Sequence, residues 1–163
     1  FPQAEWHFIG NIQSRRIPDI VSAATLIHSV SKEAHLAKID SAAQKIGKCQ
    51  RLLLEVNVSG EESKSGFSPD EVEGVIERAS GLSHISIEGL MTMAPQGKED
   101  AIVATFSGLE RLRDELQDQL RNKGISCRLS ALSMGMTEDW RYAVGFGTTI
   151  VRIGRAIFSD DFE

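Results

Sequence analysis

The sequence is poor in the residues that metal, redox and nucleic-acid-binding sites need. Its 163 residues include 2 cysteines, Cys49 and Cys127, without a metal or redox spacing, and 4 histidines without an HxH or HxxxH pairing. The formal net charge is -5, and acidic and basic residues are interleaved, so the chain has no basic patch suited to nucleic acid. No apolar run approaches the roughly 18 residues of a membrane span. We expect no bound metal, no nucleic-acid or membrane partner, and free thiols in a cytoplasmic protein.

Short apolar runs alternate with amphipathic stretches along the whole chain. Ser68, Pro69 and Glu71 in "SPDE" form a capping-box pattern for one helix. Ser31 precedes another helix, and Gly124 ends the longest one. The sequence therefore predicts strands at 6–10, 26–30, 51–58, 85–91, 128–132 and 149–153, and helices at about 16–22, 32–47, 69–79, 100–123 and 138–144.

This alternation predicts an α/β fold with a parallel sheet and helices outside it. A doubly wound sheet usually carries a GxGxxG turn after an early strand, and the sequence has none. We therefore expect a TIM-type (β/α)8 barrel. Such barrels need about 250 residues and eight strands. The chain opens at Phe1 and enters a strand almost at once, which predicts that about two βα units are missing from its front.

Arg152 is a charged residue in the apolar stretch "TIVRIGRAIF" at 149–158. In an extended strand Ile150, Arg152 and Gly154 share one face, and the residues between them share the other. If the first face points into the barrel, Arg152 projects toward its mouth. An unpaired buried guanidinium is strongly unfavourable. We therefore expect an anion or acceptor there, the alternative being an exposed strand edge.

The last two strands of such a barrel often end in a phosphate site. Ser133 offers a hydroxyl, and Gly135 and Gly154 would let the backbone approach an oxyanion. A helix beginning near Thr137 would add free N–H groups. The alternative is that both glycines only make turns. His7, Asn11 and Met91 stand at other strand ends, where each could either line a pocket or serve ordinary packing.

Several motifs together resemble the YggS/PROSC family of pyridoxal 5′-phosphate (PLP) homeostasis proteins, which have the barrel of the alanine racemase N-terminal domain. The motifs are "WHFIGNIQSRR", "IHSV", "LLLEVNVSGEESKSGF", "IEGLMTMAP" and, most specifically, "LSMGMTEDW" with "AVGFGTTIVRIGRAIF". The resemblance runs from about Trp6 to Phe158. It implies that residues 1–163 are a single partial PLP-binding barrel domain.

The resemblance also implies roles for single residues. Arg152 would face the pyridine nitrogen of PLP, and Ser133, Gly135 and Gly154 would hold its phosphate. Lys64, in "SGEESKSGF", is the candidate for a secondary lysine that forms an imine with PLP, the alternative being a pair with a neighbouring glutamate.

The chain departs from the family pattern at three places. The early strand with the family's cofactor lysine is absent, and Lys32 in "VSK" begins a helix instead. Arg155 stands where small residues are common, and "SDDFE" replaces a glycine. Only the backbone at 155 is therefore expected to touch phosphate.

Three functions follow from this resemblance. The first is a PLP-binding protein of vitamin B6 homeostasis that holds PLP through its phosphate and ring nitrogen without robust turnover, with PLP-dependent apo-enzymes as partners. The second is a racemase-like PLP enzyme, for which Tyr142 is the only tyrosine and no cofactor lysine is recognisable. The third is a truncated chain with impaired PLP binding. The full-length family form is expected to be monomeric, whereas open sheet edges would lead this chain to self-associate.

Overall fold

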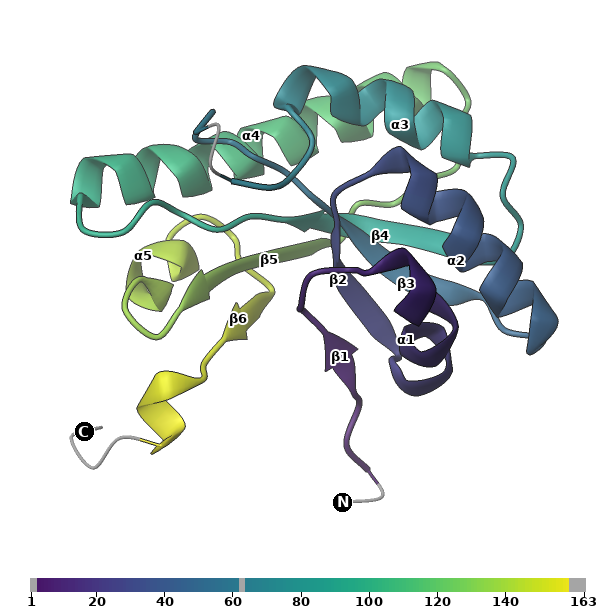
Figure 1. Ribbon diagram of the computed structural model, residues 1–163. Coiled ribbons are helices and arrows are strands. Elements are labelled where there is room, and N and C mark those ends of the chain that lie inside the picture. The colour runs from purple at the N-terminus through teal and green to yellow at the C-terminus, as the bar shows by residue number, and fades with distance from the viewer. Residues whose placement is uncertain (1–2, 62–63, 159–163) are drawn as a thin grey trace.

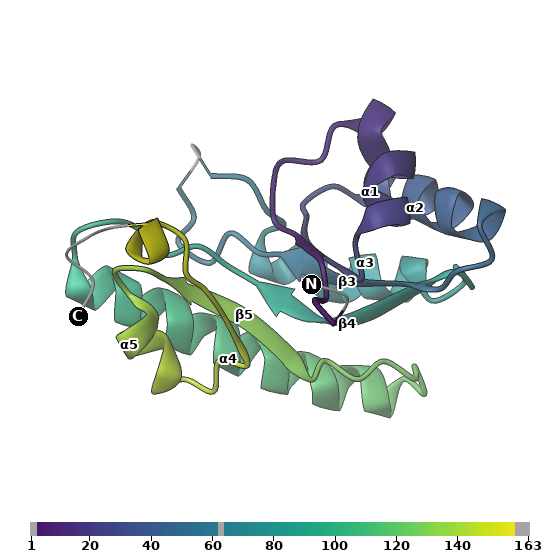
Figure 2. The ribbon, with the colours of Figure 1, turned by 90° about the horizontal axis from the view of Figure 1, so that it is seen from below.

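A single curved sheet of six parallel strands organises the molecule. The computed structural model describes residues 3–61 and 64–158. The strands lie in the order β1-β2-β3-β4-β5-β6, and each pairs in parallel with the next one in the sequence. Figures 1 and 2 show that this sheet curls into a half-barrel, with β1 and β6 as its two edges. The predicted α/β fold with a parallel sheet and helices outside it is confirmed, and the described strands form a half-barrel.

The elements follow one another in strict alternation. The strands are β1 His7–Phe8, β2 Leu26–Val30, β3 Gln50–Glu55, β4 Ile85–Met91, β5 Ala131–Met136 and β6 Ile150–Arg152. The α-helices are α1 Ile17–Ala23, α2 Glu33–Lys45, α3 Val72–Ala79, α4 Glu99–Asn122 and α5 Trp140–Val144, and short 3-10 turns lie at Ser14–Arg16, Pro69–Glu71 and Arg155–Phe158. Among the described helices, none is both long and apolar enough to cross a membrane.

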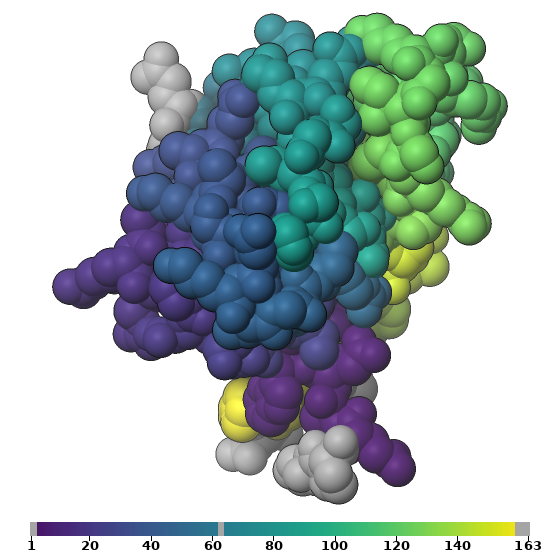
Figure 3. Space-filling model, turned by 90° about the vertical axis from the view of Figure 1, so that its right-hand side faces the viewer, coloured from purple at the N-terminus to yellow at the C-terminus, as the bar shows by residue number. Residues whose placement is uncertain are grey.

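The main hydrophobic core lies between the sheet and the helices on its outer face. Ile27, Leu52 and Leu132 point outward from three strands and are fully buried against α-helical residues such as Ile39 and Phe106. Figure 3 shows α2, α3 and the C-terminal end of α4 side by side over this face. Burying these side chains supplies the main driving force for the fold.

A second, smaller cluster marks the inner face of the half-barrel. It contains Leu26, Leu53 and Met91, with Ala131 and Ile150 packed against them. Because side chains alternate between the two faces of a strand, the residues two positions further along also point inward near the carboxyl ends. Polar residues therefore occupy the inner face above an apolar floor.

The strand boundaries differ from the predicted ones at β3 and β5. We predicted β3 to reach residue 58, but it ends at Glu55, because the chain turns at Asn57, whose side-chain amide nitrogen donates to the Glu61 carbonyl at 2.9 Å. The strand expected at 128–132 runs instead over Ala131–Met136, because the chain pairs with β4 only from Ala131 onward. Strands β1 and β6 are shorter than predicted.

Helix starts show one confirmed prediction and two corrections. The capping box of Ser68 and Glu71 is present, and it opens a 3-10 turn that continues into α3. The helix expected at about 32–47 begins one residue later, since Lys32 is the N-cap residue of α2. Helix α5 begins at Trp140, so the helical N-terminus expected near Thr137 is a turn instead.

The two sheet edges are lined by exposed apolar side chains. Trp6 and Ile9 flank β1, and Val151 lies in β6, followed by Ile157. Edge strands with such side chains are ready to pair with another chain. The half-barrel therefore has an open strand edge on each side (Figure 1), and both edges carry exposed apolar side chains.

Gly89 permits the close approach of β4 and β5, and this gives a test of the fold. A Cβ atom at position 89 would lie 1.9 Å from the carbonyl oxygen of Ala131, a backbone atom. We expect Gly89→Ala to lower the free energy of unfolding by more than about 2 kcal/mol, measured by urea denaturation. Gly81→Ala is the matched control, because nothing lies within 4 Å of its added Cβ. Equal stability of the two variants would contradict this strand register.

Candidate functional site

A cavity of about 490 Å³ opens at the carboxyl ends of the strands, between β1, β2, β4, β5 and β6. Its volume falls within the roughly 300–1,000 Å³ of small-molecule sites. The carboxyl end of parallel strands is also where barrels of this kind place their active sites. The lining residues are His7, Ile9, His28, Met91, Met93, Met136, Thr137, Ile150, Val151, Arg152, Ile153, Gly154 and Arg155.

The guanidinium of Arg152 lies on one wall of this cavity and is held by two neutral acceptors. Nη1 donates to the hydroxyl oxygen of Ser133 at 2.7 Å, and Nη2 donates to the carbonyl oxygen of Thr92 at 3.0 Å. Within the described residues, no carboxylate forms an ion pair with it. A guanidinium carries five N–H donors, so donors remain for a molecule in the cavity.

Two buried carboxylates influence Arg152 from a distance. Burial lowers the pKa of Arg152, while Asp139 and Glu55 act in the opposite direction. Glu55 accepts a hydrogen bond from the Ser65 hydroxyl at 2.6 Å, and burial raises the pKa of its carboxyl group. Asp139 accepts the backbone N–H of Met136. Both carboxylates are thus engaged elsewhere, and the positive charge of Arg152 remains available.

Ser133 is the first member of a hydrogen-bonded series that runs behind Arg152. Its hydroxyl oxygen lies 2.8 Å from Nδ1 of His28, and Nε2 of His28 lies 3.1 Å from Nδ1 of His7. Ser133 and His28 are 0% and 1% exposed, whereas His7 reaches the surface. Burial, followed by the charges of His7 and Arg152, lowers the pKa of His28 to about 4. His28 is therefore a neutral imidazole near pH 7.

The two glycines predicted for phosphate binding have different surroundings. A Cβ at Gly135 would lie 2.8 Å from Cβ of Ala143 and 2.9 Å from Cα of Trp140, and Gly135 has a φ of +93°. Helix α5 packs directly on this backbone, which accounts for the glycine. Nothing lies within 4 Å of a Cβ added at Gly154. Packing therefore does not explain why position 154 is a glycine. The missing side chain leaves open space at the cavity wall.

Lys64 lies on the loop that follows β3, beside the cavity rim. Its Nζ forms an ion pair with Glu61 at 2.8 Å and donates to the carbonyl oxygen of Met93 at 3.3 Å. Met93 itself lines the cavity. The pairing with a neighbouring glutamate, which the sequence left as the alternative, is present. The ammonium does not line the cavity itself, but it contacts Met93, which does.

The structure gathers some of the predicted residues and separates others. His7, Met91, Arg152 and Gly154 line the cavity. Ser133 lies behind Arg152 as its hydrogen-bond acceptor, and Gly135 lies under α5. Asn11 is exposed and lies outside the lining.

Sequence reasoning did not propose six of the lining residues, namely Ile9, His28, Met93, Met136, Val151 and Ile153, and it used Thr137 only as the start of a helix. The position of His28 in the predicted strand 26–30, on the same face as Leu26, was the available signal. The contact between His7 and His28 was invisible because the two residues are 21 positions apart and follow no ligand spacing.

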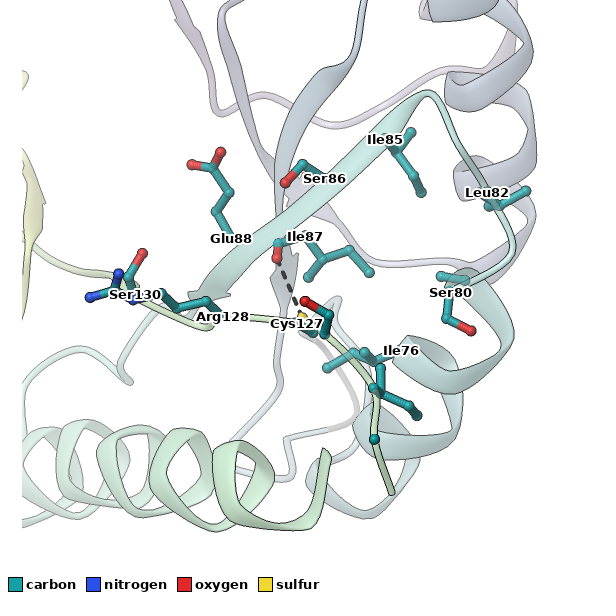
Figure 4. A pocket seen from close by; sticks show the side chains of 14 residues that line it. Ile76, Ser80, Leu82, Ile85, Ser86, Ile87, Glu88, Cys127, Arg128 and Ser130 are labelled. Atoms are coloured by element: carbon teal, nitrogen blue, oxygen red, sulfur yellow. Dashed lines mark hydrogen bonds between the residues drawn. The ribbon is translucent and has the colours of Figure 1, made fainter. Parts of the chain in front are cut away.

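A larger hollow of about 760 Å³ lies at the opposite, amino-terminal end of β4. It separates Ile85–Glu88 from the chain segment 124–130, which approach each other before β4 and β5 pair (Figure 4). The Cys127 thiol donates to the Ile87 carbonyl oxygen at 3.5 Å across it. The charged lining residues of this hollow are Glu88, which pairs with Arg51 at 2.9 Å, and Arg128, which is exposed. Neither is a half-buried cation held by neutral acceptors, so we assign the site to the smaller cavity.

Comparison with known proteins places the chain in a family. Residues 1–161 match the family model of the alanine racemase N-terminal domain. The chain is 37% identical over 158 residues to a pyridoxal phosphate homeostasis protein of Aquifex aeolicus, covering 96% of this chain and 67% of that protein. It is 33% identical over 161 residues to the protein of the same name from Synechocystis, covering 98% and 72%.

Solved structures agree with the sequence relatives. PipY of Synechococcus elongatus without PLP is 33% identical, with a TM-score of 0.88 over 98% of this chain and 73% of PipY. The same protein with PLP bound gives a TM-score of 0.86. Alanine racemase of Clostridium difficile shares the fold, with a TM-score of 0.73 at 18% identity. The chain belongs to the pyridoxal phosphate homeostasis (YggS/PROSC) family, which has the fold of the alanine racemase N-terminal domain.

Proposed function

We propose that this chain binds PLP in the carboxyl-end cavity and serves PLP homeostasis without robust turnover. The observation that carries the proposal is the Arg152 guanidinium, which lies on the cavity wall, is held by neutral acceptors and keeps N–H donors free. Relatives named pyridoxal phosphate homeostasis protein and the PLP-bound PipY structure support the ligand.

The cavity fits an aromatic ring with an acceptor nitrogen and a phosphate. Met91, Met93, Met136 and Ile150 supply apolar surface for the ring. Arg152 would donate to the pyridine nitrogen, and because a guanidinium keeps its proton, that nitrogen would remain unprotonated. PLP supplies an aldehyde and an electron-accepting ring. An unprotonated ring nitrogen makes that ring a weaker electron acceptor, which is better suited to storing PLP than to stabilising carbanions.

We place the phosphate beside Gly154, where the backbone is open. The side chain of Arg155 is engaged with Glu138 at 2.7 Å, so the backbone at 155 is its proposed contribution. We propose Ser133 and Gly135 for this end of the site as well, Ser133 through its hydroxyl, whose oxygen also accepts from Arg152.

The wider role is also part of the proposal. Residues 1–163 act as a single PLP-binding domain, and PLP-dependent apo-enzymes receive the cofactor. A cytoplasmic location suits Cys49 and Cys127, which are both free thiols. The racemase-like alternative needs an acid or base on each side of the substrate. Tyr142 instead packs against the outer core in α5 and does not line the cavity.

Removing the charge of Arg152 tests the proposed PLP site. We expect Arg152→Gln to weaken PLP binding at least about tenfold, because a hydrogen bond from a charged donor is lost. Fluorescence or absorbance titration with PLP measures the change, and circular dichroism checks the fold. Arg121→Gln is the matched control, since Arg121 is 73% exposed on α4 and pairs only with Asp118 among the described residues. Equal affinity of the two variants would contradict the assignment.

Lys64 is proposed as a second lysine that can attach PLP covalently, with its amine replacing the aldehyde oxygen as water is lost. Its position beside Met93 supports this role. We expect borohydride treatment in the presence of PLP to label Lys64, with the label mapped by peptide mass spectrometry. Lys64→Arg keeps the charge but cannot be labelled. An unlabelled Lys64 in the original chain would contradict the proposed covalent attachment.

The open edges predict that this chain self-associates. Size-exclusion chromatography with light scattering is expected to show dimers or larger species. Val151→Lys places a charge on the β6 edge and should shift the population toward monomer, whereas Ile46→Lys, exposed after α2, should not. A monomeric chain with a cooperative, high-temperature melt would contradict this prediction.

A further inference from the structure

The series His7–His28–Ser133–Arg152 carries protons whose positions are constrained by chemistry. A guanidinium has no lone pair to accept with, so Ser133 must accept the hydrogen bond from Arg152. The neutral imidazole of His28 has one N–H and one acceptor nitrogen. Ser133 and His28 therefore share a single proton across their 2.8 Å contact.

Only two arrangements satisfy every contact. In the first, the Ser133 hydroxyl donates to Nδ1 of His28, and Nε2–H of His28 donates to Nδ1 of His7. In the second, Nδ1–H of His7 donates to Nε2 of His28, Nδ1–H of His28 donates to Ser133, and the Ser133 proton is free for another acceptor. A His7 protonated on both nitrogens permits only the second arrangement.

The surroundings of His7 make such protonation possible. Its side chain is 30% exposed, and Nε2 lies 3.7 Å from the carboxylate of Glu5. Glu5 also lies 3.8 Å from Arg51 on β3. The other charged groups near the series are Arg155, which lines the cavity, and the buried carboxylates Asp139 and Glu55, which act on Arg152. His7 therefore connects solvent with a fully buried hydroxyl beside Arg152.

We propose that His7 and His28 are positioning residues that set the direction of the Ser133 hydroxyl proton. Protonation of His7 reverses the series and frees that proton as an additional donor toward the phosphate of a ligand whose ring is held at Arg152. The ligand part of this proposal rests on the proposed PLP site. His28 acts only through Ser133 in this scheme, because its two ring nitrogens are used by Ser133 and His7.

Nuclear magnetic resonance of the imidazole nitrogens tests the series without any ligand. At about pH 8 we expect His28 to carry its proton on Nε2, and we expect the proton to move to Nδ1 when His7 carries a proton on both ring nitrogens. His84→Gln is the control and should leave this movement of the His28 proton unchanged, since His84 is 32% exposed and lies outside the cavity. A His28 tautomer that stays the same when His7 is doubly protonated would overturn the series.

PLP titrations at a series of pH values test its consequence. A protonated His7 attracts an anion directly, and the phosphate of PLP also titrates, so the comparison must remove both effects. Both effects are also present in Ser133→Ala, which lacks only the hydroxyl, so they cancel when its pH profile is compared with that of the original chain. We expect affinity to rise between about pH 8 and pH 6 by about fivefold more in the original chain than in Ser133→Ala, as one hydrogen bond is gained.

The outcomes separate the two proposals. Parallel pH profiles for the original chain and Ser133→Ala would overturn the positioning role while leaving PLP binding intact. Absence of PLP binding at every pH would contradict the proposed function and the ligand part of this inference, while the His28 tautomer would still decide whether the series reverses.

Discussion

The candidate site depends on one constraint, a permanent positive charge placed on the inner face of a sheet edge. Arg152 is held by the Ser133 hydroxyl and the Thr92 carbonyl, neither of which carries a charge. Neutral acceptors fix the direction of a guanidinium without cancelling its charge. The nearest buried carboxylates, Glu55 and Asp139, are occupied by Ser65 and the Met136 backbone. The surrounding residues thus keep a cation available to a ligand.

The fold creates this arrangement through alternation along the strands. Leu26, Leu53 and Ile150 form an apolar floor inside the half-barrel, and His28 and Arg152 lie two residues beyond Leu26 and Ile150 toward the carboxyl ends. A single register thus places apolar residues at the floor of the half-barrel and polar residues toward the carboxyl ends of the strands. The same geometry opens the cavity at the end where Met93, Thr137 and Gly154 leave the strands.

Much of this architecture could be predicted from local sequence. The six strands and their parallel arrangement follow from the alternation of short apolar runs with amphipathic stretches, which is a local property. Period-two alternation placed Ile150, Arg152 and Gly154 on one face but left open which way that face points. The residues at which the strands begin and end were harder to predict. β5 starts at Ala131 because pairing with β4 begins there, a contact between segments about forty residues apart.

The polar series behind Arg152 could not be predicted for the same reason. Ser133 and His28 are 105 residues apart, and no spacing rule joins them. The resemblance to the family indicated Ser133 as a phosphate ligand, whereas the structure buries its hydroxyl between Arg152 and His28. Gly135 likewise suggested an anion site, and its nearest neighbours are atoms of α5. Tertiary contacts decided each of these environments.

A crystal structure of the chain with PLP would test the central claim most directly. The account predicts that the ring occupies the carboxyl-end cavity, that Arg152 donates to the pyridine nitrogen, and that the phosphate lies beside the Gly154 backbone. Its contradiction would be PLP bound elsewhere, or bound in this cavity with the guanidinium turned away from the ring.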